Sequence, residues 1–395
     1  MTRREMADYR KAGPIEKPRN PDALEVSSCR AARHAGHYSI LNRTDLSRRG
    51  ASNVQPQLVR PRMAVRRDER PRRAWARACA NIALIKYWGK RENATNGPAT
   101  FSLSLALDAL VTETTVESSQ QDGRDRIMLN GSPARGQARE RIQCYLDLWR
   151  QRGLISGAVC VTSFNRFPTS AGLASSASGF AALAGALAAY GDRSIDRHEL
   201  SRLARLGSGS AARSVAGGLA TLPAGRDPAS RQILPAAEVP WGMVIAITSR
   251  AAKQVPSRAG MAAAAATSPY YPAWISQAVR DAQEALAAAT LRDLGALGRI
   301  VEANALAMHA CMLAARPALL YWNPASISLI QAARRWRAEG LEAYATLDAG
   351  PNVAFLARRE DLDRIARRVR RVADVLDVIR SLPGQGVEAR AEGRL

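Results

Sequence analysis

The chain of 395 residues is long enough for two domains, and 47% of its residues are hydrophobic, so it can build a sizeable core. It contains no apolar run of roughly 18 residues, which argues against a transmembrane helix, and residues 1–20 lack the apolar segment of a secretory signal. The five cysteines are widely spaced without a CxxC pair, and the four histidines do not cluster with them. This usage favours reduced thiols in a cytoplasmic protein over disulfides or a zinc site.

Positive charge is concentrated near the N-terminus. The formal net charge is +22, and about half of that excess lies in residues 1–77. Residues 1–74 show no helix or strand periodicity and scatter Pro, Arg, Asn and Ser, which predicts a basic, disordered extension, with Met63 as a candidate for the true start. The alternative is an arm for nucleic acid or an acidic membrane, but interleaved aromatic residues are missing. We expect no membrane and no specific nucleic-acid partner.

From Trp75 onward the sequence predicts a mixture of strands and helices. Strands are predicted over residues 78–83, 102–107, 112–117, 159–164, 243–248, 343–347 and 353–356. Helices are predicted over residues 138–150, 179–190, 197–206, 276–289, 291–314, 325–339 and 362–375, with Asp196 as an N-cap. Because strands and helices do not alternate strictly, the pattern favours an α+β fold over a doubly wound sheet.

A turn rich in Gly and Ser, PTSAGLASSASG, separates a predicted strand from a predicted helix. Small residues let the backbone approach a polyanion, and the helix presents free N–H groups and the positive end of its dipole. The alternative is a tight structural connection. The turn resembles the ATP-binding loop PxxxGLGSSAA of the GHMP kinase superfamily, with an alanine at the second glycine, as in the decarboxylase branch. The resemblance implies ATP contacts from Pro168, Ala171, Gly172, Leu173, Ala174, Ser175, Ser176 and Ser178.

The segment NIALIKYWGK places Lys86 and Lys90 four residues apart beside Tyr87. Buried lysines need an anionic partner, although two surface lysines beside an aromatic pair would give the same pattern. The segment resembles the N-terminal signature of mevalonate diphosphate decarboxylases. The resemblance implies that Lys86 lies at the reacting centre, and that Tyr87 and Lys90 hold the substrate diphosphate. Ser102 and Ser104 are similar to part of the family's serine-rich substrate loop, whereas Phe101 stands where serine is frequent.

Two further segments carry basic residues among small ones. The guanidinium of Arg213 in GSGSAARS suits a carboxylate or phosphate, unless the segment is a flexible loop with an exposed arginine. It resembles the family motif GSGSAxRS, which implies that Arg213 grips the substrate carboxylate and that Ser210 contacts substrate. AAKQVPSRAGM resembles the family's diphosphate-binding region, implying contacts from Lys253, Ser257 and Arg258.

A carboxylate, Asp348, lies in the turn TLDAGPN between two predicted strands. An aspartate at this position can simply cap the turn. The motif is similar to the family's DAGPN, which implies that Asp348 is the catalytic residue. The stretches Asn304 to Cys311 and Tyr321–Trp322 resemble the family's bacterial members.

The resemblance runs in order from about residue 78 to about residue 360. It implies an α+β, two-lobed fold like that of GHMP kinases, with mixed or antiparallel sheets covered by helices and the active site in the cleft between lobes. We expect lobes over residues 75–240 and 241–380, followed by a flexible tail over 381–395.

The resemblance also implies a reaction: mevalonate 5-diphosphate and ATP, with Mg²⁺, give isopentenyl diphosphate, ADP, phosphate and carbon dioxide. A related decarboxylase of mevalonate 5-phosphate, or a mevalonate 3-kinase, is the alternative within the family, and a non-enzymatic binder acting through its basic tail is the alternative outside it. A cytoplasmic homodimer is expected, because the family often forms homodimers. The sequence assigns no metal ligands.

Overall fold

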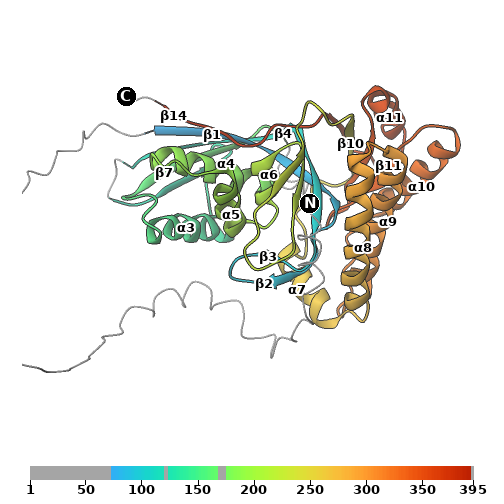
Figure 1. Ribbon diagram of the computed structural model, residues 1–395, viewed down its shortest axis with the longest axis horizontal. Helices are drawn as coiled ribbons and strands as arrows, with labels where there is room; N and C mark the ends of the chain where they lie inside the picture. The colour runs from blue at the N-terminus through green and yellow to red at the C-terminus, as the bar shows by residue number, and fades with distance from the viewer. Residues whose placement is uncertain (1–72, 120–122, 168–174, 393–395) are drawn as a thin grey trace, which may run out of the picture. The chain divides into compact units, whose positions relative to one another are not determined.

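The computed structural model describes residues 73–119, 123–167 and 175–392. The predicted extension over 1–74 lies almost wholly outside the described residues, as do Met63 and residues 168–174 of the predicted ATP loop. All of the described residues belong to one compact unit. The residues predicted to form the first lobe and those predicted to form the second each contribute a sheet and a set of helices to this unit (Figure 1).

The larger sheet comes mainly from the first half of the chain. Its strands follow the order β14-β1-β4-β7-β5-β6, and β8 and β9 extend it from β4. The bounds are β1 Arg73–Ile85, β4 Ser102–Ser118, β5 Arg126–Leu129, β6 Ser132–Pro133, β7 Val159–Asn165, β8 Leu219–Leu222, β9 Arg231–Leu234 and β14 Glu388–Glu392. All neighbours are antiparallel except β5 and β7. A separate pair, β2 Lys90–Glu92 and β3 Gly97–Pro98, lies beyond the end of β1.

Strand β1 changes character along its length. Its first residues alternate between buried alanines and partly exposed Arg73, Trp75 and Arg77, and its later residues are buried without interruption. Alternation is the pattern of a strand with one solvated face, and continuous burial is that of a strand covered on both faces. The alanines let helix α4 (Ser175–Tyr190) pack closely, since a Cβ on Gly185 would lie 3.2 Å from the Cβ of Ala76. The solvated end of β1 therefore changes into a buried end that leads to Lys86.

The predicted strands 102–107 and 112–117 are one strand, β4. Its first part pairs with β8 and its last part with β7, while β1 runs along its other edge. Residues 108–111 between the two predicted strands also belong to β4, and the ladder to β1 runs on both sides of a register shift there. Ser102 and Ser104 therefore lie on a strand, where both hydroxyls bond Arg213, rather than in a loop.

The smaller sheet comes from the second half, in the order β11-β12-β10-β13, and all of its pairs are antiparallel. Its bounds are β10 Trp241–Ile247, β11 Tyr344–Thr346, β12 Val353–Arg358 and β13 Asp377–Ser381. Every residue of β10 is buried, because the strand has neighbours on both edges and helices on its faces. One apolar cluster joins β10 to β1 and β4 through helices α8 (Tyr271–Thr290) and α9 (Leu294–Leu313), so the two sheets share a core.

The helices are close to those predicted, with additions. Their bounds are α3 Gly136–Gln151, α4 Ser175–Tyr190, α5 Arg197–Gly207, α6 Ala211–Ala216, α7 Ser257–Thr267, α8 Tyr271–Thr290, α9 Leu294–Leu313, α10 Pro324–Ala338 and α11 Leu362–Val369, with the 3-10 turn η4 at Arg359–Asp361. Asp196 caps α5 as predicted, because its side chain accepts from the backbone N–H of Glu199 at 2.8 Å. Helices α6 and α7 were not predicted, and α11 ends earlier than expected.

The prediction of a flexible tail over 381–395 is wrong for residues 381–392. Ser381 ends β13, and β14 pairs with the outer edge of β1. Arg77 and Glu388 form an ion pair at 2.9 Å across the two strands, and Arg390 covers the ring of Trp75. The exposed edge of β1 needs hydrogen-bond partners, and the alternating segment VEARAE supplies them. Residues 73 and 74, predicted in the extension, belong to β1.

Candidate active site

A half-buried ion pair joins the two halves of the chain. Lys86 follows directly after β1, and Asp348 lies in the turn between β11 and β12. The Nζ atom of Lys86 donates to Oδ1 of Asp348 at 2.8 Å and to the carbonyl oxygen of Ala83 at 2.8 Å. The side chain of Lys86 is 1% exposed, whereas that of Asp348 is 41% exposed. The carboxylate is thus accessible to a substrate, whereas the lysine behind it is enclosed by the protein.

The position of Lys86 is fixed from the second half of the chain. Its backbone N–H donates to Oδ1 of Asn304 on α9 at 2.8 Å. Nδ2 of Asn304 donates to Oδ2 of Asp281 on α8 at 2.7 Å, and Gln277 donates to the other oxygen of Asp281. Asn304 and Asp281 are buried, so these bonds are shielded from competing water. Asp281 was not identified in the sequence, because a lone aspartate in a helix carries no signal.

The charges around Asp348 keep it ionised. Burial by itself would raise the pKa of Asp348, but the charge and hydrogen bond of Lys86, together with the charges of Lys253 and Arg213, lower it below its ordinary value. Burial lowers the pKa of Lys86, and Asp348 opposes that shift. Asp348 is therefore a carboxylate at neutral pH, with three cations around it.

A neutral histidine lies behind the same turn. His309 on α9 is 2% exposed, and its ring lies 4.8 Å from that of Trp322. Burial and the charge of Lys86 lower its pKa to about 3, despite opposing contacts with the backbone of Asp348 and Leu347. His309 therefore adds no charge to the centre at neutral pH. The sequence signal for it was only a likeness of its segment to family members.

Arg213 lies on the short helix α6 and is 2% exposed, which excludes the alternative of an exposed arginine in a flexible loop. Its Nε donates to Oγ of Ser104 at 2.9 Å, and its Nη1 donates to Oγ of Ser102 at 2.7 Å. Its Nη2 has no hydrogen bond to a described residue. Two strand hydroxyls thus fix the plane of the guanidinium and leave one edge free for another acceptor.

Helix α6 is fastened to β1 by Asn81. The Nδ2 of Asn81 donates to Oγ of Ser214 at 2.8 Å and to the carbonyl oxygen of Ser210 at 3.0 Å. The hydroxyl of Ser210 lies 3.4 Å from that of Ser208. Ser210 thus lies at the start of the helix that carries Arg213, where its backbone is held by the strand that leads to Lys86.

A second group of cations lies around Tyr87 and Lys90. Lys90 Nζ donates to Oδ1 of Asn96 at 2.8 Å, and Arg258 Nη2 lies 3.4 Å from the same oxygen. The hydroxyl of Tyr87 donates to the carbonyl oxygen of Asn96 at 2.9 Å. Burial and the charges of Arg258 and Arg141 lower the pKa of Lys90 to about 8. Sequence reasoning missed Asn96 and Arg141.

Lys253 connects the two groups. Its Nζ donates to Oγ of Ser257 at 3.3 Å, at the first residue of α7. Burial lowers the pKa of Lys253, and the charge of Asp348 opposes that shift. Lys253, Ser257 and Arg258 thus come from one loop and helix start, as their spacing in the sequence suggested.

The described part of the predicted ATP loop begins α4. Ser175 and Ser176 are partly exposed at its first turn, and Oγ of Ser208 donates to Oγ of Ser176 at 3.3 Å. The hydroxyl of Ser178 is buried against Thr112 at 2.6 Å. The structure does not support the predicted contact from this hydroxyl, because it holds α4 against β4. Pro168, Ala171, Gly172, Leu173 and Ala174 lie outside the described residues.

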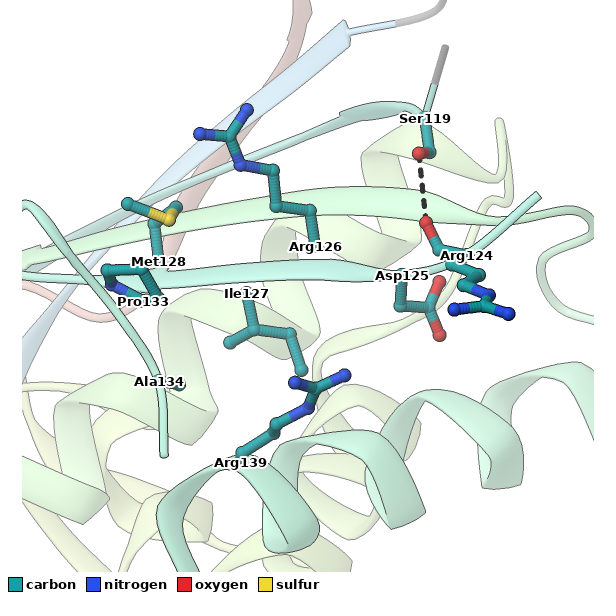
Figure 2. Close-up of a pocket in the computed structure, with 9 residues that line it drawn as sticks. All are labelled: Ser119, Arg124, Asp125, Arg126, Ile127, Met128, Pro133, Ala134 and Arg139. Atoms are coloured by element: carbon teal, nitrogen blue, oxygen red, sulfur yellow. Dashed lines mark hydrogen bonds between the residues drawn. The ribbon is translucent and has the colours of Figure 1, made fainter. Parts of the chain in front are cut away.

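A hollow of about 270 Å³ lies away from these residues, beside β5, β6 and the start of α3 (Figure 2). It is lined by Arg124, Arg126 and Arg139, whose guanidinium groups point in different directions (Figure 2). Asp125 beside them is satisfied by Arg150 at 2.6 Å and by the backbone N–H of Val159 at 2.8 Å. None of the predicted site residues lines this hollow, so it is not the candidate site.

Comparisons with known proteins agree with this arrangement. A diphosphomevalonate decarboxylase-like N-terminal domain matches residues 78–233, and a mevalonate 5-diphosphate decarboxylase C-terminal domain matches residues 243–388. The diphosphomevalonate decarboxylase of Candida albicans is 34% identical over 307 residues, which are 73% of this chain and 85% of that protein. The chain belongs to the diphosphomevalonate decarboxylase family. The family prediction from the motifs is confirmed.

Solved structures of the family share the fold. One, described as MDDEF in complex with MVAPP, AMPPCP and magnesium, is 37% identical with a TM-score of 0.76, and the match covers 82% of this chain and 100% of that one. Another, the mevalonate diphosphate decarboxylase from Enterococcus faecalis, is 36% identical with a TM-score of 0.75 and the same coverage. The predicted α+β fold is confirmed. Fungal and bacterial members match at similar identity, so the bacterial type stays a prediction.

Among the described residues, no helix is both long and apolar enough to span a bilayer. Within the same residues, no three His, Cys, Asp or Glu side chains gather as a metal site.

Proposed function

We propose that this decarboxylase converts mevalonate 5-diphosphate and ATP into isopentenyl diphosphate, ADP, phosphate and carbon dioxide, with Asp348, Lys86 and Arg213 at the reacting centre. The observation that carries the assignment of roles is the 2.8 Å ion pair of Lys86 with a partly exposed Asp348, within a set of cations that includes Arg213. The match to family members over nearly their full length supports the reaction.

Asp348 acts on the 3-hydroxyl group. A tertiary hydroxyl is a poor leaving group, and transfer of the γ-phosphoryl group of ATP to it makes a good one. The ionised carboxylate takes the hydroxyl proton during this transfer, which is the work of a general base. Lys86 holds the carboxylate in place and keeps it ionised, because their ion pair favours the charged form.

Arg213 acts on the C1 carboxylate. When the 3-phosphate leaves, it takes the C3–O electron pair; the C1–C2 bond then breaks, its electrons form the C2–C3 double bond, and carbon dioxide is released. The free Nη2 edge of Arg213 binds the carboxylate, while Ser102 and Ser104 hold the guanidinium plane. Orientation of this kind lowers the entropic part of the barrier.

The second group of cations holds the diphosphate. Tyr87, Lys90, Lys253, Ser257 and Arg258 supply the donors, and Arg141 adds a third strong cation beside Lys90 and Arg258. Binding energy gained at the diphosphate, away from the reacting carbon, fixes that carbon against Asp348.

ATP and Mg²⁺ fit the start of α4. Ser175, Ser176 and Ser208 offer oxygen donors beside the positive end of the helix dipole, which suits phosphate and a hard cation. Among the described residues, no acidic or histidine side chains gather as metal ligands. We infer that Mg²⁺ binds mostly to phosphate oxygens of ATP. When bound, Mg²⁺ would neutralise charge on the ATP phosphates. Ser175 and Ser176 would orient the polyphosphate.

The test is a substrate comparison with the full-length chain, ATP and Mg²⁺. Mevalonate, its 5-phosphate and its 5-diphosphate are supplied separately, and ADP and the organic product are measured by mass spectrometry. We expect isopentenyl diphosphate from the diphosphate alone. A product phosphorylated on the 3-hydroxyl that keeps its carboxylate would mean a kinase and remove the role of Arg213. Turnover of the 5-phosphate alone would overturn the substrate.

The family resemblance also supports three finer proposals: a homodimer, a cytoplasmic location, and lobes divided near residue 240. Light scattering of the purified chain measures the first, fractionation of the source cells the second, and limited proteolysis the third. A monomeric mass, a membrane or secreted location, or cleavage far from residue 240 would each remove the corresponding proposal.

A further inference from the structure

One asparagine connects the donors of the proposed diphosphate site. Oδ1 of Asn96 is the acceptor that Lys90 and Arg258 share, at 2.8 and 3.4 Å, and the carbonyl oxygen of Asn96 accepts from the hydroxyl of Tyr87 at 2.9 Å. These three donors come from β2, α7 and the segment after β1. A single neutral residue therefore aligns side chains from three separate segments.

The conformation of Asn96 is itself fixed. The residue is 3% exposed and adopts a φ of 51°, in the left-handed region that asparagine tolerates better than most residues. Its Nδ2 donates to the carbonyl oxygens of Arg205 and Leu206, each at 3.0 Å. These carbonyls belong to the last turn of α5, where no helical N–H is available to them. The side chain therefore cannot rotate without leaving buried carbonyls unpaired.

The cations around Asn96 lack a compensating acid. Lys90 and Arg258 form no ion pair with a described carboxylate, and neither does Arg141, whose Nη2 donates to the carbonyl oxygen of Gly207 at 3.2 Å. Burial lowers the pKa of both Lys90 and Arg141. Desolvated cations that share a neutral acceptor bind an anion more strongly than cations already paired with a carboxylate.

We propose that Asn96 is a positioning residue for the diphosphate, whose neutral amide holds Lys90, Arg258 and Tyr87 in a converging arrangement without cancelling their charge. A diphosphate accepts from the same donors with charged oxygens and outcompetes the amide oxygen. A carboxylate at this position would hold the same donors and would also neutralise them. This inference rests on the proposed role of Lys90, Arg258 and Tyr87 as diphosphate ligands.

The decisive variant is Asn96→Asp in the full-length chain, because it changes the charge of the acceptor with little change in shape. We expect the KM for mevalonate 5-diphosphate to rise about tenfold or more, with kcat changed by less than about threefold, since the lost interaction is with the non-reacting end. Asn93→Asp is the matched control: it adds the same charge to an exposed residue of the same turn, and we expect its KM to stay within about threefold of the wild type.

A pH profile separates this role from a structural one. Lys90 faces Arg258 of α7 and Arg141 of α3, and Tyr87 beside it faces Arg205, Arg213 and Tyr271. The pKa of Lys90 is lowered to about 8, so we expect the kcat/KM of the wild type to fall above that pH as Lys90 loses its proton. A carboxylate at position 96 raises the pKa of Lys90, so the alkaline limb of Asn96→Asp moves to higher pH. A residue that only capped α5 would lower Tm and leave this limb in place.

A second variant guards against misfolding, because the carboxylate of Asn96→Asp would face the carbonyls of Arg205 and Leu206. Asn96→Gly keeps the left-handed backbone and removes the amide. We expect its KM to rise with the alkaline limb still near pH 8. An unchanged KM in every folded variant would overturn the inference.

Lys90→Met and Arg258→Gln distinguish the role of Asn96 from that of the diphosphate site itself. If they raise KM but neither Asn96 variant does, only the role of Asn96 fails. If they leave KM unchanged, the proposed diphosphate site fails, and the role of Asn96 with it.

Discussion

The reacting centre and the diphosphate site differ in whether their cations are paired with a carboxylate. At the reacting centre, Lys86 and Asp348 are paired at 2.8 Å, and the pKa of the carboxylate is lowered by its cationic neighbours. At the diphosphate site, Lys90, Arg141 and Arg258 have no such acid among the described residues, and Lys90 and Arg258 share the amide oxygen of Asn96 as their acceptor. Pairing fixes a group and its ionisation, as a catalytic base requires. Cations without a partner keep their affinity for an incoming anion.

The largest expected effect comes from breaking the paired centre. Asp348→Asn keeps the shape of the side chain and removes the base, so we expect kcat to fall by about a thousandfold or more while the KM for the diphosphate changes little. Release of ADP and of isopentenyl diphosphate measures it. Asp363→Asn, in an exposed pair with Arg380, is the matched control and should keep full activity. Unchanged turnover in Asp348→Asn would remove Asp348 from the mechanism.

The next effect tests whether a positive charge at position 213 is enough to align the substrate carboxylate. Arg213→Lys keeps the charge but loses the planar fork that bonds Ser102 and Ser104. We expect kcat to fall by about a hundredfold, because the carboxylate is no longer aligned for elimination. Single-turnover measurements should show that phosphoryl transfer slows less than release of carbon dioxide. Equal slowing of both steps would contradict the assignment of Arg213 to the carboxylate.

A smaller effect tests the unpaired site through pH. The pKa of Lys90 is lowered to about 8, so the cation is present below that pH and lost above it. We expect kcat/KM to fall by up to about tenfold per pH unit above 8, since this parameter reports the free enzyme. Lys90→Arg stays protonated throughout the accessible range, so its profile should lack this limb. The same limb in both proteins would place the titration elsewhere.

The smallest expected effect on kcat comes from breaking the hydrogen bonds that α8 and α9 form behind Lys86. Asn304→Ala removes the acceptor for the backbone N–H of Lys86 and leaves one oxygen of Asp281 without its donor. Unpaired buried groups of this kind cost about 2 kcal/mol in the free energy of unfolding. Urea denaturation measures that loss, and we expect kcat to fall by less than about tenfold in the folded fraction. A fully stable variant would show that these bonds do not hold the lysine.

The motifs correctly singled out residues that the structure places close together. They did not predict the hydrogen bonds and ion pairs that surround each of these residues. Lys86 and Asp348 were both identified, although 262 positions separate them. Asp281, Asn96 and Arg141 were not, because each is a common residue in a segment without a special pattern. Ser178 was assigned to the ATP loop by its type, and the fold buries its hydroxyl against Thr112.

The sequence by itself determined the family, the α+β fold and most of the helices, since motifs and hydrophobic periodicity depend on neighbours along the chain. The tertiary structure alone decided which charges are paired. The pairing of β14 with β1 and the contact of Arg258 with Asn96 join residues far apart in the chain. Burial and pKa depend on that joining, because desolvation and Coulomb energy follow distance in space and not separation in sequence.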